Sequence, residues 1–171
     1  MQLEPDEPLL TVFSFGIGQD SSGLLARLIE EPDVRHEIAP GRLIIVASDT
    51  GDEHVHTYQY LNQVRQWCEK AGLRFFWLTP EYGFHSEAWR SLPDQWRRNS
   101  TVGIKAGRKS CTDNLKIKPI YRFLSSFVRQ EFPIYAQGNE ALIRFAQYYG
   151  PIRVLIGFAA DETSRIISTD G

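Results

Sequence analysis

Residues 43–53 read Leu-Ile-Ile-Val-Ala-Ser-Asp-Thr-Gly-Asp-Glu, and this stretch decides the fold class. Its first six residues form an apolar run that is typical of a β-strand buried on both faces. Three carboxylates follow at once, from Asp49, Asp52 and Glu53. Two interpretations of this acidic turn stay open. It either binds a Mg²⁺ ion or a ribose or adenine group, or it forms the capped first turn of the next helix.

The same pattern continues on both sides of this stretch. Runs of β-branched and aromatic residues predict further strands, and apolar residues at helical spacing predict helices between them. This alternation predicts an open α/β fold, in which helices flank both faces of a parallel sheet. The expected strands are 10–15, 43–48, 73–78 and 152–158; the expected helices run from Asp20 or Ser21 to Pro32 and over 54–71, 117–130 and 138–148, with 81–113 irregular.

Length and composition exclude several classes of protein. The chain has 171 residues, enough for a single domain with a real core, and residues 1–9 are expected to form a polar lead-in. A net charge of −2 excludes a nucleic-acid binder that is basic as a whole, so any anion site must be local. The acidic N-terminus lacks the features of a signal peptide, and no run reaches the roughly 20 apolar residues of a membrane span. Two cysteines make no disulfide framework, so a cytoplasmic location is expected.

Glycine-containing segments follow the first and the last expected strand. Residues 14–21 read Ser-Phe-Gly-Ile-Gly-Gln-Asp-Ser and run into a helix N-terminus, where free N–H groups favour an anion such as phosphate. Their spacing is neither the Walker pattern nor GxGxxG, and a tight turn without a ligand is the alternative. Gly157 is likewise followed by Asp161 and Glu162, and a simple capped helix is the alternative there.

Residues 105–122 are the local candidate for anion binding, because they hold six cationic side chains and one acid, Asp113. Arginine grips phosphate through two hydrogen bonds, and lysine acts as a point charge. Pro119 favours a loop that enters a helix, which would place the preceding lysines at the mouth of a site. A solvated helix face is the alternative. The cations also favour the thiolate form of Cys111, whereas Cys68 is expected in the core.

Four segments, taken in order, resemble the motifs of the PP-loop ATP pyrophosphatase superfamily, specifically its phosphoadenosine-phosphosulfate (PAPS) reductase-like branch. The family carries Ser-Gly-Gly-x-Asp-Ser after the first strand, Asp-Thr-Gly-x-Glu after the second, a Cys-Thr-x-x-Lys-x-x-Pro-like segment, and a final glycine followed by an acid and an arginine. The matching residues are Gly16-Ile17-Gly18-Gln19-Asp20-Ser21, Asp49-Thr50-Gly51-Asp52-Glu53, Cys111-Thr112 with 116–119, and Gly157 with Glu162 and Arg165.

The resemblance implies an adenine nucleotide alpha hydrolase-like (HUP), Rossmann-like fold. It also implies an enzyme that cleaves ATP to AMP and pyrophosphate and adenylylates an acceptor; in several relatives sulfur then replaces the adenylate. The implied cofactor is Mg²⁺, held by Asp20 and Asp49, and the implied substrate is ATP or PAPS. The implied catalytic residues are Asp20, Lys116, Arg165 and Cys111. The implied nucleotide-binding residues are Ser14, Phe15, Gly16, Gly18, Gln19, Asp20, Ser21, Asp49, Thr50, Gly51, Glu53, Lys109, Gly157 and Glu162.

The sequence also departs from the family's pattern. Ile17 stands where the family has a glycine that wraps the phosphate, and Gln19 replaces a common lysine. Ala159 stands where sulfonucleotide reductases place an arginine. The Glu-Cys-Gly segment of true PAPS reductases is absent, and relatives continue further beyond the last motif, so a C-terminal extension is expected to be missing here.

Three functions stay open on these observations. ATP-dependent adenylylation, with sulfur transfer as its use, is the leading hypothesis. PAPS reduction with thioredoxin is the second, and it lacks the nucleophilic tail cysteine. The third is a nucleotide-binding or partner-binding module without catalysis, which the departures favour. The sequence does not decide the acceptor, a nucleic acid or a small molecule, or whether the chain forms a homodimer.

Overall fold

The computed structural model describes residues 9–100 and 110–157, and within them the centre of the molecule is a four-stranded parallel sheet. Its strand order is β3-β2-β1-β4, and each neighbouring pair runs parallel. The strands are β1 (Leu10–Ser14), β2 (Arg42–Ser48), β3 (Arg74–Leu78) and β4 (Ile152–Ile156). The prediction of an α/β fold with a parallel sheet is confirmed.

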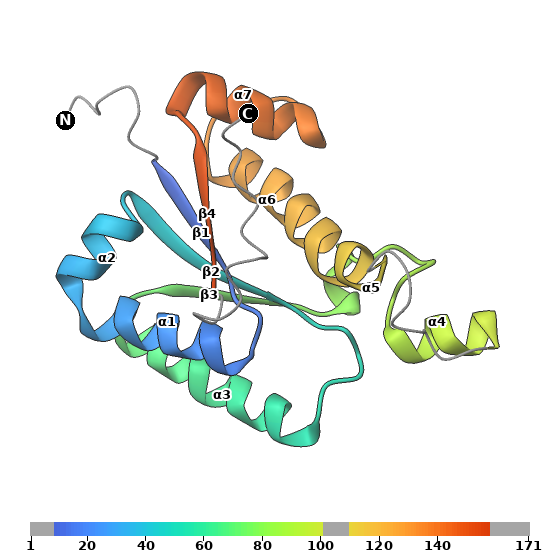
Figure 1. Cartoon of the computed structure of the whole chain (residues 1–171). Helices are drawn as coiled ribbons and strands as arrows, with labels where there is room; N and C mark the ends of the chain where they lie inside the picture. The colour runs from blue at the N-terminus through green and yellow to red at the C-terminus, as the bar shows by residue number, and fades with distance from the viewer. Residues whose placement is uncertain (1–8, 101–109, 158–171) are drawn as a thin grey trace, which may run out of the picture.

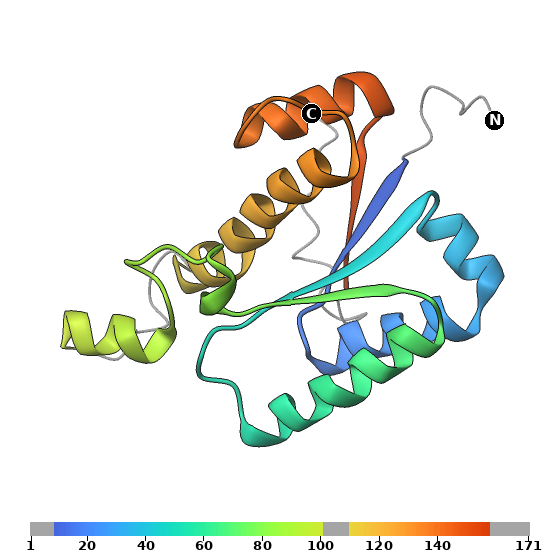
Figure 2. The ribbon, with the colours of Figure 1, turned by 180° about the vertical axis from the view of Figure 1, so that it is seen from behind.

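Helices cover both faces of the sheet, as predicted (Figures 1 and 2). On one face lie α1 (Gln19–Glu30) and α3 (Val55–Lys70), and on the other lie α6 (Lys118–Glu131) and α7 (Asn139–Tyr149). The shorter segments are α2 (Pro32–Ile38), η1 (Pro80–Tyr82), α4 (Leu92–Asn99), α5 (Ser110–Thr112) and the π-helical η2 (Asp113–Ile117). In the two described ranges, no helix combines the length and the apolar character needed to cross a bilayer.

Two hydrophobic cores hold the helices on the sheet, one on each face. Successive residues of β2 alternate between them, because neighbouring side chains of a strand point to opposite faces. Ile44 and Val46 join the core beneath α6 and α7, whereas Ile45 and Ala47 join the core beneath α1 and α3. All four are fully buried, which explains the continuous apolar run in this strand. The buried strands β1 and β2 give the loops at their carboxyl ends a rigid base.

The strand order has a reversal point between β1 and β4. From β1 the chain adds β2 and then β3 on one side, and later returns to place β4 on the other side of β1. In open α/β sheets, ligands bind in the crevice beyond the carboxyl ends of the strands at such a reversal. The loops after β1 and β4 therefore define the part of the fold most suited to a ligand.

The start of α1 and the role of Pro32 differ from prediction. Gly18 is the N-cap of α1 and no side chain of the described residues caps this helix, so the expected cap by Asp20 or Ser21 is wrong. The Ser21 hydroxyl instead donates to the Gly18 carbonyl at 2.9 Å. Pro32 does not only end α1; it opens α2, where the proline's missing N–H is no loss because a first-turn N–H has no helical partner.

The expected irregular and basic segments are also more helical than predicted. The stretch expected to be irregular contains α4, whose N-terminus is capped by the Ser91 hydroxyl accepting from the Asp94 N–H at 3.2 Å. Pro119 lies in the first turn of α6, which directly continues η2. Lys116 and Lys118 therefore lie on helical backbone and not on a loop, because proline is tolerated in a first helical turn.

Candidate functional site

The loop from β1 into α1 forms the first half of the candidate site. Ile17 has a φ of +63°, the left-handed region, which costs an L-residue about 1–2 kcal/mol and is unusual for a β-branched one. Gly18 follows in an extended conformation, and no side chain of the described residues caps α1. The first N–H groups of α1 are thus left to a partner from outside the helix, and the helix dipole favours an anionic one.

Gly157, directly after β4, packs against the first turn of α1. A Cβ atom on Gly157 would lie 2.9 Å from Cα and 3.0 Å from N of Ser21, and 3.2 Å from the carbonyl carbon of Asp20. These are backbone atoms, so they cannot swing aside as the end of a side chain can. The missing side chain at 157 therefore allows the end of β4 to touch the start of α1. Two predicted segments that lie far apart in sequence meet at the reversal of the strand order.

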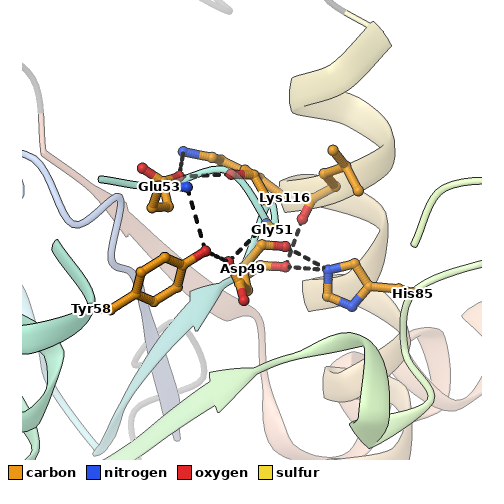
Figure 3. A network of polar contacts seen from close by, with 9 residues as sticks. Asp49, Gly51, Glu53, Tyr58, His85 and Lys116 are labelled. Carbon is orange, nitrogen blue, oxygen red and sulfur yellow. Dashed lines mark hydrogen bonds and ion pairs between the residues drawn. The ribbon is translucent and has the colours of Figure 1, made fainter. Parts of the chain in front are cut away.

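The loop after β2 forms the second half, and it is closed by Asp49 (Figure 3). The buried Asp49 accepts through Oδ1 from the Gly51 N–H at 2.8 Å and from the Tyr58 hydroxyl at 3.0 Å. The Tyr58 oxygen in turn accepts from the Glu53 N–H at 3.4 Å. Burial, aided by the nearby Asp49 carboxylate, raises the pKa of the Tyr58 phenol and keeps it a donor. Hydrogen bonds among its own residues and to Tyr58 therefore hold the loop that carries the Asp-Thr-Gly-x-Glu motif in one conformation.

Lys116 reaches this loop from the opposite side of the site (Figure 3). Its Nζ lies 3.8 Å from Oε1 of Glu53, which also accepts from the Thr50 hydroxyl at 2.9 Å. Both charged groups are partly exposed, so the pair adds little stability. The ion pair matters because it holds the positive charge of Lys116 at the carboxyl edge of the sheet. Lys116 belongs to the π-helical η2, a distortion that often marks functional sites.

The helix-capping interpretation of the acidic turn is wrong. The N-cap of α3 is His54, whose Nδ1 accepts from the N–H of His56 at 3.3 Å. Asp52 and Glu53 precede this cap, and Glu53 turns toward Thr50 and Lys116 instead. The motif therefore belongs to the polar network at the sheet edge.

A buried histidine, His85, contacts the end of β2 and was not predicted as a functional residue. Its Nε2 lies 2.9 Å from the Asp49 carbonyl and 3.3 Å from the Ser48 hydroxyl. A carbonyl only accepts, so Nε2 carries the proton. The Ser48 hydroxyl donates to the Leu115 carbonyl at 2.6 Å, directly before Lys116. His85 thus links the end of β2, the 79–85 segment and η2.

Stability between pH 7.5 and 5.5 should depend on His85. Burial lowers the pKa of His85, with Asp49 opposing the shift, so the folded state favours the neutral ring more than the unfolded state does. The contribution of neutral His85 to the free energy of unfolding is therefore fully present above the pKa of an unfolded histidine, about 6.5. It declines as the pH falls below that value, by at most about 1.4 kcal/mol per pH unit. Urea unfolding across this range should show a smaller decline for His85→Gln than for the wild type. Equal declines would contradict the assignment.

Gly51 fixes the loop against α4. It has a φ of +74°, and a Cβ atom there would lie 2.5 Å from Cβ of Ser91. The Leu92 N–H donates to the Thr50 carbonyl at 2.8 Å, which joins α4 to the same loop. Glycine is therefore required at this position both by the backbone conformation and by the close contact.

Gly51→Ala should destabilise the protein more than Gly72→Ala. Gly72 has a similar φ of +67°, but a Cβ atom there meets no other described atom within 4 Å, so its substitution isolates the conformational cost, about 1–2 kcal/mol. The collision with Ser91 should add about 1–3 kcal/mol for Gly51→Ala. The free energies of unfolding of both variants, measured in urea, give this difference directly. Equal losses would show that the loop does not press on α4.

The remaining predicted residues have different positions. Asp20 is exposed in the first turn of α1, and Cys111 is exposed in α5. Cys68 is fully buried and burial raises its pKa to about 11, so its predicted core position is confirmed. Within the part of the chain that the structure describes, no group of three or more metal-ligating side chains occurs. Lys109, Glu162 and Arg165, with Ala159, lie outside the described residues.

Comparisons of this chain with models of known protein families and with curated proteins find no match. The likeness to PP-loop enzymes therefore rests on the motifs and on the places that they occupy in this fold.

Proposed function

We propose that this chain is a PP-loop enzyme of the PAPS reductase-like branch, with an adenine nucleotide alpha hydrolase-like fold. It binds ATP with Mg²⁺ at the carboxyl edge of the sheet and cleaves it to AMP and pyrophosphate, adenylylating an acceptor. The observation that carries the proposal is the contact between Gly157 and the first turn of α1. It sets Gly157, the glycine of the last motif, against the segment that carries the first motif, at the reversal of the strand order, where α/β sheets bind ligands.

The phosphates would lie on the loop from Gly16 to Ser21. The exposed loop glycines and the uncapped first turn of α1 offer backbone N–H groups, and a phosphate group would satisfy them. The backbone at the ends of β1 and β2, around Ser14 and Ser48, borders the same edge and would receive the adenine ring. The α-phosphate would then lie between α1 and the loop after β2.

The acidic residues of the site fit a magnesium–nucleotide complex. Mg²⁺ at such sites takes one or two carboxylates, while phosphate oxygens and water complete its shell, so a cluster of three acids is not needed. Asp20 is the exposed carboxylate beside the loop, whereas Oδ1 of Asp49 already accepts two hydrogen bonds. Asp20 would therefore be the principal ligand, and Asp49 would contribute mainly by shaping its loop. The ion would supply charge neutralisation on the phosphates.

In the reaction, an acceptor oxygen attacks the α-phosphorus and forms a new phosphorus–oxygen bond. The bond to the bridging oxygen breaks, pyrophosphate leaves with the electron pair, and the acceptor proton passes to solvent. The chain's contribution is to position the phosphates and to stabilise the growing negative charge. Lys116, held beside Glu53, supplies a cation at this edge. Arg165 and Cys111 are the further catalytic residues of this proposal.

Calorimetric titration with ATP and with PAPS, each with and without Mg²⁺, tests the proposal. We expect ATP to bind at least about tenfold more tightly with Mg²⁺, a difference of about 1.4 kcal/mol. Tighter binding of PAPS would replace ATP chemistry with sulfonucleotide chemistry. Binding of neither nucleotide would overturn the proposal. ATP binding that is never followed by pyrophosphate release, whatever acceptor is added, would leave a binding module without catalysis.

A further inference from the structure

A groove between α6 and α7 lies apart from the candidate nucleotide site. It has a volume of about 740 Å³ and is open to solvent. The groove is lined by Lys118, Tyr121, Arg122, Ser125, Ser126 and Arg129 of α6 and by Gly138, Asn139, Leu142 and Ile143 at the start of α7. None of the proposed nucleotide-binding residues takes part.

The charged side chains that line this groove are all basic. Among the lining residues, Lys118, Arg122 and Arg129 carry charge and none is acidic. Lys118 is paired with Asp113 at 2.6 Å, at one end of the groove. Arg122 donates to the Phe84 carbonyl at 2.9 Å, a neutral acceptor, and among the described residues no acid pairs with its positive charge. The groove therefore favours a ligand that carries negative charge.

Apolar side chains also line the groove. Tyr121 and Ile143 are each 51% exposed, and the half-buried Leu142 lies between α7 and the core. Grouped exposed apolar side chains mark interaction surfaces, and tyrosine and arginine are the residues that protein interfaces favour. A partner must therefore supply apolar side chains as well as charge.

We propose that this groove binds an acidic segment of a partner protein. An apolar side chain of the segment would pack between Tyr121 and Ile143, and its carboxylates would pair with Arg122 and Arg129. Leu142 and Ile143 in the lining are aliphatic and suit an apolar protein side chain. The chain's net charge of −2 also lacks the broad positive field that nucleic-acid binding needs. This inference is independent of the proposed function.

Fluorescence anisotropy with model ligands tests the proposal on the full chain. The probe is a labelled peptide of roughly twelve residues, made of glutamate with leucine at helical spacing. A peptide with glutamine in place of glutamate and a single-stranded thymidine oligonucleotide of similar length are the comparison ligands. We expect the acidic peptide to bind most tightly, and to bind more weakly when salt is raised from about 50 mM to about 300 mM.

Matched variants locate the binding. Arg122→Glu with Arg129→Glu should weaken acidic-peptide binding at least about tenfold, whereas Arg65→Glu with Lys70→Glu, an equal charge change on α3, should leave it unchanged. Ile143→Ser should also weaken it without any change of charge, which keeps the test valid if the arginine variant is unstable. Tighter binding of the oligonucleotide, equal binding of the glutamine peptide, equal loss in the α3 variant or no binding at all would overturn the proposal.

Discussion

Asp20→Ala is expected to remove the Mg²⁺ dependence of ATP binding and to lower turnover at least about 100-fold. Asp20 is exposed in the first turn of α1, directly beside the loop that would hold the phosphates. Its carboxylate would bring the ion to the nucleotide, so its removal leaves the charge of the phosphates without compensation. Calorimetry with and without Mg²⁺ measures the first effect, and pyrophosphate release, once an acceptor is known, measures the second.

Asp33→Ala is the matched control for this substitution. Asp33 is likewise an exposed carboxylate in a first helical turn, that of α2. Its removal changes the net charge equally and should leave ATP binding as in the wild type. If Asp20→Ala keeps a Mg²⁺-dependent affinity like that of Asp33→Ala, Asp20 does not hold the ion.

Gly157→Ala should be the second most damaging change. The added Cβ would lie 2.9–3.0 Å from backbone atoms of Ser21, so either the end of β4 or the start of α1 must move. We expect a stability loss of about 1–3 kcal/mol, as for an overpacked core, and ATP binding at least about tenfold weaker. Urea unfolding and calorimetry measure the two effects separately.

Gly23→Ala provides the contrast for Gly157→Ala. Gly23 lies in the same helix α1, and a Cβ atom there meets nothing within 4 Å among the described residues. Alanine in a helix interior should stabilise the protein by about 0.5–1 kcal/mol and leave ATP binding intact. A Gly157→Ala variant that is as stable and as active in binding as Gly23→Ala would show that the contact does not shape the site.

Much of the fold was predictable because the strands are short apolar runs separated by glycine, proline and polar residues. The run over 43–48 and the glycine after α3 placed β2 and that helix within one or two residues. The helix caps were less predictable. The sequence offered Asp20 and Ser21 as caps for α1, yet the chain uses Gly18, because its first turn packs against Gly157. A contact between residues so far apart leaves no local signal.

The site was predictable in part. The motif at 49–53 and Lys116 do lie together, as the common edge of parallel strands leads one to expect. His85 was missed because its hydrogen bonds reach residues 36 and 37 positions away in the chain. Tyr58 was missed because a single hydroxyl contact with Asp49 leaves no periodic pattern in the sequence. Ile17 was noticed as a departure, but its left-handed conformation could not be read from its type, since isoleucine disfavours that region.

Chemical-shift mapping of the backbone amides during an ATP–Mg²⁺ titration tests the central claim most directly, because it reports where the nucleotide binds. The account predicts that the amide signals of Gly16, Gly18 and Gly157 shift together and saturate with one affinity, while Gly72, at the far edge of the sheet, and Gly138, in the α6–α7 groove, stay unchanged. Shifts confined to Gly138, or no shifts at the three site glycines at saturating ATP, would contradict it.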